Sequence, residues 1–419
     1  MNLEVLPHTR PSETADAGRQ VSAEGFVYAL FLVFGTGAWL TLNGSFSELP
    51  LLVEKLPEGW RMGSILAVVV QLANAGPALY IGVRWLLLSR IREERLAMMA
   101  TYIVLGIGTA SMLALAATWD VLTDFAGSER SVAFLALVFL AAFADCTSSV
   151  LFWNFAGGFP EVYMSALGTG QDRQGMSGVV TTLITWIQCV ACDEPAFSAT
   201  AYFIILAQLV FLSAVAYSLL LRRQHRYTPD ISPAATVEED LKGVQRWWLL
   251  GLQAWASVLV NGSTMSCLPL AAKPYGRLAY QWAQNSSMLI DPIAAALGQH
   301  VPLRTSGLLL LAVIMTLLHG YIFALSLEAT SPPFLLGCGS TVLVLVAAAA
   351  RALSAYTKVR INVLFHAAGS SSAQLLDQDE PIVAKRQLMW SGVAMQVGSC
   401  VGSVTVFALI NLTSWFRMS

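Results

Sequence analysis

Long apolar stretches separated by short polar segments dominate the chain. A helix that crosses the hydrocarbon core of a bilayer needs about 20 predominantly apolar residues, and eleven stretches meet that length. They are residues 26–46, 64–88, 96–117, 131–153, 163–190, 200–221, 246–268, 274–297, 305–327, 334–357 and 388–411. The pattern predicts an all-α integral membrane protein with eleven transmembrane helices. The fifth helix is the least regular, and is either broken or begins near Gln174.

Two long polar segments divide the predicted helices. Residues 222–245 are charged and contain Pro229 and Pro233, which favours a flexible linker. This linker separates a six-helix half, residues 26–221, from a five-helix half, residues 246–411, in a six-plus-five carrier bundle. Residues 366–387, rich in Ser and Asp, predict a second loop. The remaining segments, 1–25 and 412–419, are predicted to be terminal tails.

The composition excludes several classes of protein. Of the 419 residues, 56% are hydrophobic and only 12% are charged, whereas soluble domains carry about 25% charged residues. The lipid bilayer is therefore the expected environment. A net charge of −2 and the lack of a basic tract argue against binding of nucleic acid. Residues 1–22 have no apolar core, so they do not form a cleavable signal peptide.

The distribution of basic residues predicts the orientation in the membrane. Cytoplasmic segments of membrane proteins carry an excess of Lys and Arg. If the N-terminus is inside, the inside segments hold 15 Lys and Arg residues and the outside segments hold 5. An odd number of spans then places the N-terminus in the cytoplasm and the C-terminus outside the cell.

Residues 39–60 carry the strongest indication of a functional site. Asn43, Glu48 and Pro50 fall where lipid-embedded helix is expected. A charged residue at the centre of a bilayer costs about 2.5–3.5 kcal/mol on insertion scales, and the backbone groups freed by proline need partners that lipid does not offer. Such a stretch is tolerated where it lines a protein-enclosed cavity, so we predict that it lines a substrate site. Trp39, one turn from Asn43, is a candidate for stacking on a flat ligand.

A similar motif follows in the second half of the chain. Asn43-Gly44-Ser45 is followed by Leu49-Pro50-Leu51, and Asn261-Gly262-Ser263 is followed by Leu268-Pro269-Leu270. Carriers are often built from repeats that meet at the substrate site. The match suggests an internal repeat, with a chance match as the alternative.

Several motifs together resemble one family. These are Asn43-Gly44 with Glu48-Leu49-Pro50 and Leu56-Pro57-Glu58-Gly59-Trp60, then Gln174-Gly175-Met176-Ser177, Pro274-Tyr275-Gly276-Arg277-Leu278-Ala279-Tyr280 and Gly392-Val-Ala-Met-Gln396. They resemble the animal riboflavin transporters, solute carrier family 52. The resemblance implies a facilitative riboflavin transporter of the plasma membrane. We expect transport by alternating access, and the absence of a nucleotide-binding motif predicts no direct ATP coupling. Protons are a candidate coupling ion, because a buried intramembrane carboxylate can carry one.

The candidate substrate-binding residues combine these signals. They are Trp39, Asn43, Glu48, Asp145, Ser148, Gln174, Ser177, Asn261, Tyr275, Arg277, Asp291 and Gln396. Intramembrane carboxylates are functional-site hypotheses by default, so Asp145 and Asp291 are either substrate acceptors or proton-coupling sites. The alternative for both is a structural ion pair with Arg351 or Arg173. For Tyr275 and Arg277 the alternative is an anchor at the membrane interface.

The chain also departs from the resembled family. Asp145, Ser149 and Asp291 stand where the family carries other residues, which leaves substrate identity more open than family membership. Two alternatives therefore remain: a carrier for another flat heterocycle, such as a nucleoside or nucleobase, and a cell-surface receptor. No phosphate-binding loop, HExxH or GxSxG motif is present, so an enzyme, a cofactor or a metal site is not expected. Cys189 and Cys192 are expected to be free thiols, with a disulfide as the alternative.

Overall fold

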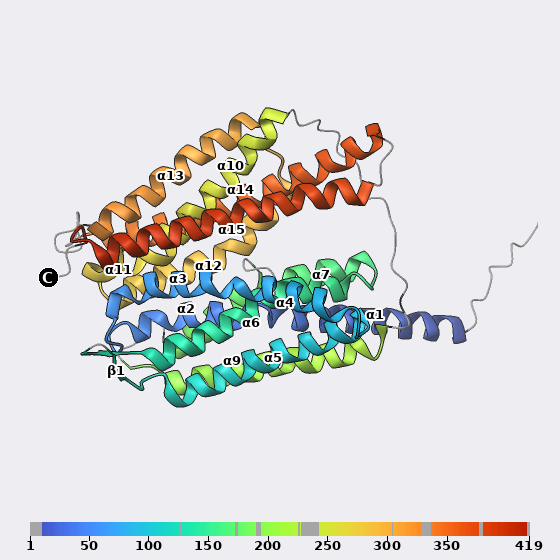
Figure 1. Cartoon of the computed structure of the whole chain (residues 1–419), viewed down its shortest axis with the longest axis horizontal. Helices are drawn as coiled ribbons and strands as arrows, with labels where there is room; N and C mark the ends of the chain where they lie inside the picture. The colour runs from blue at the N-terminus through green and yellow to red at the C-terminus, as the bar shows by residue number, and fades with distance from the viewer. Residues whose placement is uncertain are drawn as a thin grey trace, which may run out of the picture.

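The computed structural model describes residues 11–125, 127–171, 175–189, 194–224, 227, 243–303, 305–327, 337–376 and 380–416. Two groups of roughly parallel helices lie side by side (Figure 1). The first group holds α1 (Pro11–Thr36), α2 (Leu40–Leu52), α3 (Met62–Ala73), α4 (Ala75–Leu87), α5 (Glu93–Thr118), α6 (Val132–Ala156), α7 (Glu161–Gln171), α8 (Met176–Gln188) and α9 (Ala199–Leu221), with the short helix η1 (Gly59–Arg61).

The second group begins after the predicted linker. It holds α10 (Gly243–Leu259), the π-helix η3 (Val260–Cys267), α11 (Leu268–Ala272), η4 (Lys273–Tyr275), α12 (Arg277–His300), α13 (Thr305–Leu327), α14 (Gly339–Leu376) and α15 (Glu380–Leu412). This second group lies beside the first in Figure 1, and the division into six and five spans stays a prediction.

Most helices of the described residues have the length and apolar character of membrane spans. Seven qualify individually, and the bent pair Glu24–Thr36 with Leu40–Leu52 makes an eighth. The predicted all-α membrane bundle is confirmed. The other three predicted stretches are occupied by α7 with α8, by α10 with η3 and α11, and by α12. Polar residues such as Asn261 and Asp291 lower their apolar character, and the count of eleven spans stays a prediction.

The first span differs from its prediction in shape. The stretch 26–46 was expected as one helix, but α1 ends at Thr36 and α2 begins at Leu40 with its axis turned by 56°. Gly35 and Gly37 lie at the break, and glycine is a poor helix former. The prediction of a break in the fifth span is matched by two helices, α7 and α8, within residues 161–188.

Two polar segments are more regular than expected. The predicted loop at 366–387 is wrong, because α14 continues to Leu376 and α15 begins at Glu380. The Ala, Gln and Leu residues of this segment are strong helix formers and extend both helices past their apolar parts.

A hairpin, β1 (Thr123–Phe125) paired antiparallel with β2 (Ser128–Arg130), lies between α5 and α6, with Gly127 at a φ of 79° in its turn.

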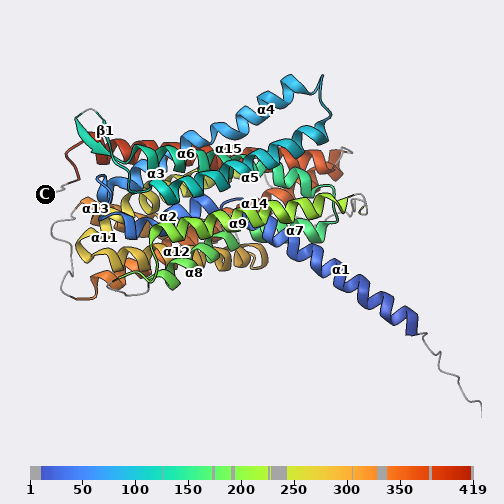
Figure 2. The ribbon, with the colours of Figure 1, turned by 90° about the horizontal axis from the view of Figure 1, so that it is seen from below.

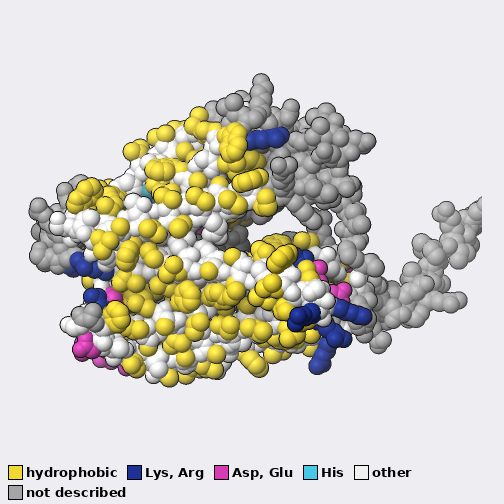
Figure 3. Space-filling model, in the orientation of Figure 1, with side chains coloured by type: hydrophobic (Ala, Val, Ile, Leu, Met, Phe, Trp, Pro, Cys, Tyr) yellow, Lys and Arg dark blue, Asp and Glu magenta, His cyan; other side chains and the backbone are white. Residues whose placement is uncertain are grey.

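The surface agrees with a lipid environment. Hydrophobic side chains cover the middle of the visible face, and charged side chains gather towards its two ends (Figure 3). The view from below shows α4 and the N-terminal part of α1 projecting from the bundle at the same end (Figure 2). Towards that end Figure 3 shows a hollow between the two halves. The halves are thus more separated at one end than at the other.

Candidate substrate site

The break in the first span is held open by polar groups of α6. Asp145 Oδ2 accepts hydrogen bonds from Thr41 Oγ1 at 2.7 Å and from the Leu42 backbone amide at 2.9 Å. Ser148 Oγ donates to the Ala38 carbonyl at 3.2 Å. A carboxylate at a helix N-terminus satisfies orphan amides and the helix dipole. Through these contacts Asp145 and Ser148 hold the break in place, next to the candidate residues of α2.

A strip of polar side chains then runs between α2 and α8. Asn43 Nδ2 donates to Ser177 Oγ at 2.9 Å, and Ser47 Oγ donates to Thr181 Oγ1 at 3.3 Å. The i to i+4 spacing on both helices places these pairs on facing sides. We call this set of contacts, together with Glu48 and its partner described next, the α2–α8 strip. The predicted candidates Asn43 and Ser177 are therefore in direct contact, whereas Gln174 lies outside the described residues.

Glu48 lies at the far end of the α2–α8 strip and is fully buried. Gln188 Nε2 donates to Glu48 Oε1 at 2.9 Å, and within the described residues Glu48 Oε2 and Gln188 Oε1 have no hydrogen-bond partner. Nearby, the Tyr202 hydroxyl donates to the Gly44 carbonyl at 3.1 Å. Gln188 was not among the residues selected from the sequence. A polar amide within an apolar helix was the signal that could have identified it.

The second half carries an equivalent of the Asn43–Ser177 pair. Asn261, in the π-helix η3, donates through Nδ2 to Ser399 Oγ of α15 at 2.9 Å and to the Ser257 carbonyl at 2.9 Å. A π-helix leaves backbone groups out of the regular ladder and is frequent at functional sites. Gly398 allows this contact, because a Cβ at that position would overlap the backbone carbonyl of Ala254 in α10.

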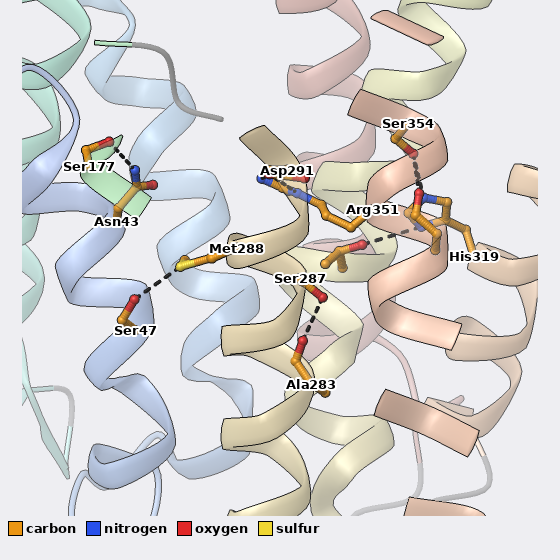
Figure 4. Close-up of polar contacts among 12 residues, drawn as sticks. Asn43, Ser47, Ser177, Ala283, Ser287, Met288, Asp291, His319, Arg351 and Ser354 are labelled. Carbon is orange, nitrogen blue, oxygen red and sulfur yellow. Dashed lines mark hydrogen bonds and ion pairs between the residues drawn. The ribbon is translucent and has the colours of Figure 1, made fainter. Parts of the chain in front are cut away.

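Asp291 of α12 forms a buried ion pair with Arg351 of α14. Arg351 Nε lies 2.7 Å and its terminal nitrogen 2.6 Å from Asp291 Oδ2 (Figure 4). The structural alternative stated for Asp291 is thus realised with Arg351, while Arg173 lies outside the described residues. A buried pair of this kind is costly to break, so the pair fixes α12 against α14.

A buried histidine sits close to this pair. His319 of α13 contacts Ser263 through Nδ1, and its Nε2 lies 3.0 Å from Ser354 Oγ of α14 (Figure 4). The sequence analysis did not select His319. A histidine inside the apolar stretch 305–327 was the signal that could have identified it. His319 thus connects α13 with η3 and with α14.

The remaining candidates lie elsewhere. Tyr275 is the last residue of η4 and Arg277 is the first residue of α12. Trp39 precedes α2 and is half-buried. Gln396 is exposed on α15 and its Oε1 accepts from Asn74 Nδ2 at 3.1 Å. Asn74 occupies the junction of α3 and α4, so this contact joins the two halves.

The cysteine prediction is partly wrong. Cys189, the residue that follows α8, is disulfide-bonded, where a free thiol was expected. Cys192 lies outside the described residues. Cys146, Cys267, Cys338 and Cys400 are thiols that form no disulfide.

The fold and the site define a helical membrane carrier: interrupted apolar helices in both halves hold buried amides, hydroxyls and carboxylates inside the bundle. The sequence model described as "Solute carrier family 52, riboflavin transporter" matches residues 23–242 and 222–418. The chain belongs to this family, and its membership of a non-enzymatic carrier family agrees with the expectation of no enzyme.

Two relatives named as riboflavin transporters support the assignment. The chain is 28% identical to solute carrier family 52, riboflavin transporter, member 3-A of Danio rerio, over 94% of this chain and 97% of the relative. It is 30% identical to member 2 of Sus scrofa, over 93% and 95%. A solved structure of a bacterial homologue of the human lysosomal transporter Spinster is similar with a TM-score of 0.46 and 11% identity, covering 94% of this chain and 98% of that chain.

Proposed function

We propose that this protein transports riboflavin across the plasma membrane by alternating access, without direct coupling to ATP. Its family membership supports riboflavin as substrate, since the named relatives are riboflavin transporters. The observation that carries the proposal is the α2–α8 strip, in which Asn43 contacts Ser177 and Glu48 contacts Gln188. Polar side chains buried along a broken first helix provide hydrogen-bonding groups where lipid offers none.

The chemistry of these residues suits a flavin. Riboflavin combines a flat tricycle, a pyrimidine edge of donors and acceptors, and a polyhydroxyl chain. Small-molecule sites are mostly apolar with a few placed polar groups. We propose Asn43, Glu48 and Ser177 as contacts from the first half and Asn261 and Gln396 as contacts from the second. Trp39 and Gln174 stay proposed contacts for the ring and the polar edge.

Contacts between the halves define what must change during transport. Ser47 Oγ lies 3.1 Å from Met288 Sδ of α12 (Figure 4), and Asn411 Nδ2 donates to Ser64 Oγ at 3.0 Å. Near the end of α8, Gln281 Nε2 donates to the Cys189 carbonyl at 2.5 Å. Rocking of one half against the other has to break these contacts and close the hollow at the opposite end.

The topology completes the proposal. We place the N-terminus in the cytoplasm and the C-terminus outside the cell, with eleven spans in a plasma-membrane carrier and protons as the candidate coupling ion. The excess of Lys and Arg in the predicted inside segments supports this orientation. Epitope tags at both ends test it, because only the C-terminal tag should be detected on intact cells.

The direct test of function is uptake of labelled riboflavin by cells that express the chain. We expect saturable uptake that excess unlabelled riboflavin suppresses and excess uridine does not. Suppression by uridine alone would indicate a nucleoside carrier. No uptake by a protein shown to be at the cell surface would contradict the proposal.

A further inference from the structure

Asn285 of α12 is a buried amide that the family motifs and the contacts above leave without a role. It is 0% exposed, and neither its Nδ2 nor its Oδ1 has a hydrogen-bond partner among the described residues. Buried side-chain amides are nearly always paired, because an unpaired one loses its bonds to water without replacement. The absence of a partner therefore calls for an explanation. The sequence Asn285-Ser286-Ser287 is also a glycosylation sequon, but full burial excludes that use.

The neighbours of Asn285 on its helix show where its side chain points. Residues three and four apart share one face of a helix, so Gln281, Asn285 and Met288 form one stripe along α12. Gln281 bonds to the Cys189 carbonyl and Met288 contacts Ser47, both in the first half of the chain. Figure 4 shows Met288 directed at Ser47 across the boundary. Asn285, placed between these two residues, faces the interface between the halves.

The helices on the other side of this interface also present unpartnered polar atoms. Within the described residues these include Glu48 Oε2 of α2, and Thr182 Oγ1 and Gln188 Oε1 of α8. The carrier must bind its substrate between the halves if they rock about it. Unpaired donors and acceptors on α2 and α8, two helices that pack against α12, are groups that a polar ligand would satisfy.

We infer that the side-chain amide of Asn285 forms a paired hydrogen bond with the imide edge of the transported heterocycle. A carboxamide presents one donor and one acceptor side by side, and a ring imide presents the complementary carbonyl and N–H at the same spacing. Asn uses the same bidentate geometry towards adenine. The inference rests on the proposed transport of riboflavin, whose pyrimidine edge carries such an imide, and it names the atoms of the substrate that this residue binds.

The test compares riboflavin with 3-methylriboflavin, in which a methyl group replaces the imide hydrogen. A site built to bond an N–H discriminates strongly against an analogue that lacks it. We expect wild-type protein to take up riboflavin at least about tenfold faster than the methylated compound. Asn285→Ala should lose this preference, because its riboflavin rate falls about tenfold while its rate with 3-methylriboflavin stays unchanged. Rates are normalised to surface protein.

Ser287→Ala is the matched control. Ser287 lies two residues away on the same helix and its hydroxyl already donates to the Ala283 carbonyl at 2.6 Å (Figure 4). It should keep the wild-type preference. Retention of the wild-type preference by Asn285→Ala would overturn the inference. Equal uptake of both flavins by wild-type protein would overturn it too, with the proposed function intact. Uptake of neither flavin by wild-type protein contradicts the proposed function and the inference together.

A stability measurement separates binding from a structural role. Because Asn285 has no partner in the described residues, purified Asn285→Ala should unfold without ligand at the wild-type temperature or above it, and riboflavin should stabilise it less than wild type. A lower unfolding temperature without ligand would overturn the inference. If Asn285→Ala is retained inside cells, Asn285→Asp replaces it, since it keeps the shape and removes the donor. A wild-type riboflavin rate in Asn285→Asp would contradict the inference.

Discussion

Asn43 and Asn261 occupy corresponding places in the two halves of the molecule. Asn43 follows the break between α1 and α2, and Asn261 lies in the π-helix η3 that continues α10. Each donates a 2.9 Å hydrogen bond to a serine, Ser177 in α8 and Ser399 in α15. Both serines belong to the fifth predicted span of their half. The short repeat noticed in the sequence therefore has a matching pair of contacts.

This equivalence predicts that the two asparagines contribute similarly to transport. Asn43→Ala and Asn261→Ala should each lower riboflavin uptake about tenfold, the effect of losing one substrate hydrogen bond. Ser177→Ala and Ser399→Ala should have smaller effects, because the asparagine amides remain. Uptake per surface molecule measures this. A normal rate in Asn261→Ala beside a strong loss in Asn43→Ala would show that only the first half binds substrate.

The Asp291–Arg351 pair predicts a large effect on stability. Arg351→Leu removes the guanidinium from a buried carboxylate, which typically costs about 3–5 kcal/mol. The purified variant should therefore unfold well below the wild-type temperature. Replacing both residues, Asp291→Asn with Arg351→Gln, should recover much of the loss, because no charge is left buried without its counterion. Equal stability of Arg351→Leu and wild type would contradict the structural role of the pair.

Glu48 is predicted to be essential for transport. Glu48→Gln replaces the carboxylate beside Gln188 with an amide of the same shape, and we expect saturable riboflavin uptake to be lost while surface expression is kept. If protons are the coupling ion and Glu48 carries them, residual uptake should no longer differ between acidic and neutral medium. Unchanged uptake with an unchanged response to pH would show that Glu48 is not part of the substrate site. Ser45→Ala is the control, since the Ser45 hydroxyl donates to the Thr41 carbonyl within α2.

Gly398 predicts how closely α15 must approach α10. The Cβ of Gly398→Ala would overlap the Ala254 carbonyl, so α15 has to move away and the contact between Asn261 and Ser399 weakens. Overpacking of this kind costs about 1–3 kcal/mol. Gly392→Ala is the control on the same helix, because nothing lies within 4 Å of its added Cβ. Thermal unfolding of both variants should show a loss for Gly398→Ala alone.

The sequence predicted the helices well because their signal is local. Twenty apolar residues in a row identify a span wherever it packs, and the Asn and Glu residues inside such runs identified α2 as the candidate substrate helix. The break after Thr36 was not predicted, because it depends on Asp145, 104 positions from its partner Thr41. A contact of that separation leaves no periodic pattern in the sequence.

The sequence also could not predict which partners the buried polar residues bind. From the sequence, Asp145 and Asp291 were both intramembrane carboxylates with the same predicted roles. In the structure Asp145 binds the N-terminus of α2, whereas Asp291 binds Arg351. Asn285 was not selected from the sequence, since its lack of a partner among the described residues depends on three-dimensional packing. The loop predicted at 366–387 failed for a local reason: polar residues can continue a helix once it leaves the membrane.

The central claim is best tested with purified protein in lipid vesicles. Vesicles loaded with unlabelled riboflavin should accumulate labelled riboflavin from outside by exchange, without ATP, and vesicles with Glu48→Gln should not. This result would show that the chain alone carries riboflavin through a site that includes α2. Failure of well-folded wild-type protein to exchange riboflavin would contradict the account.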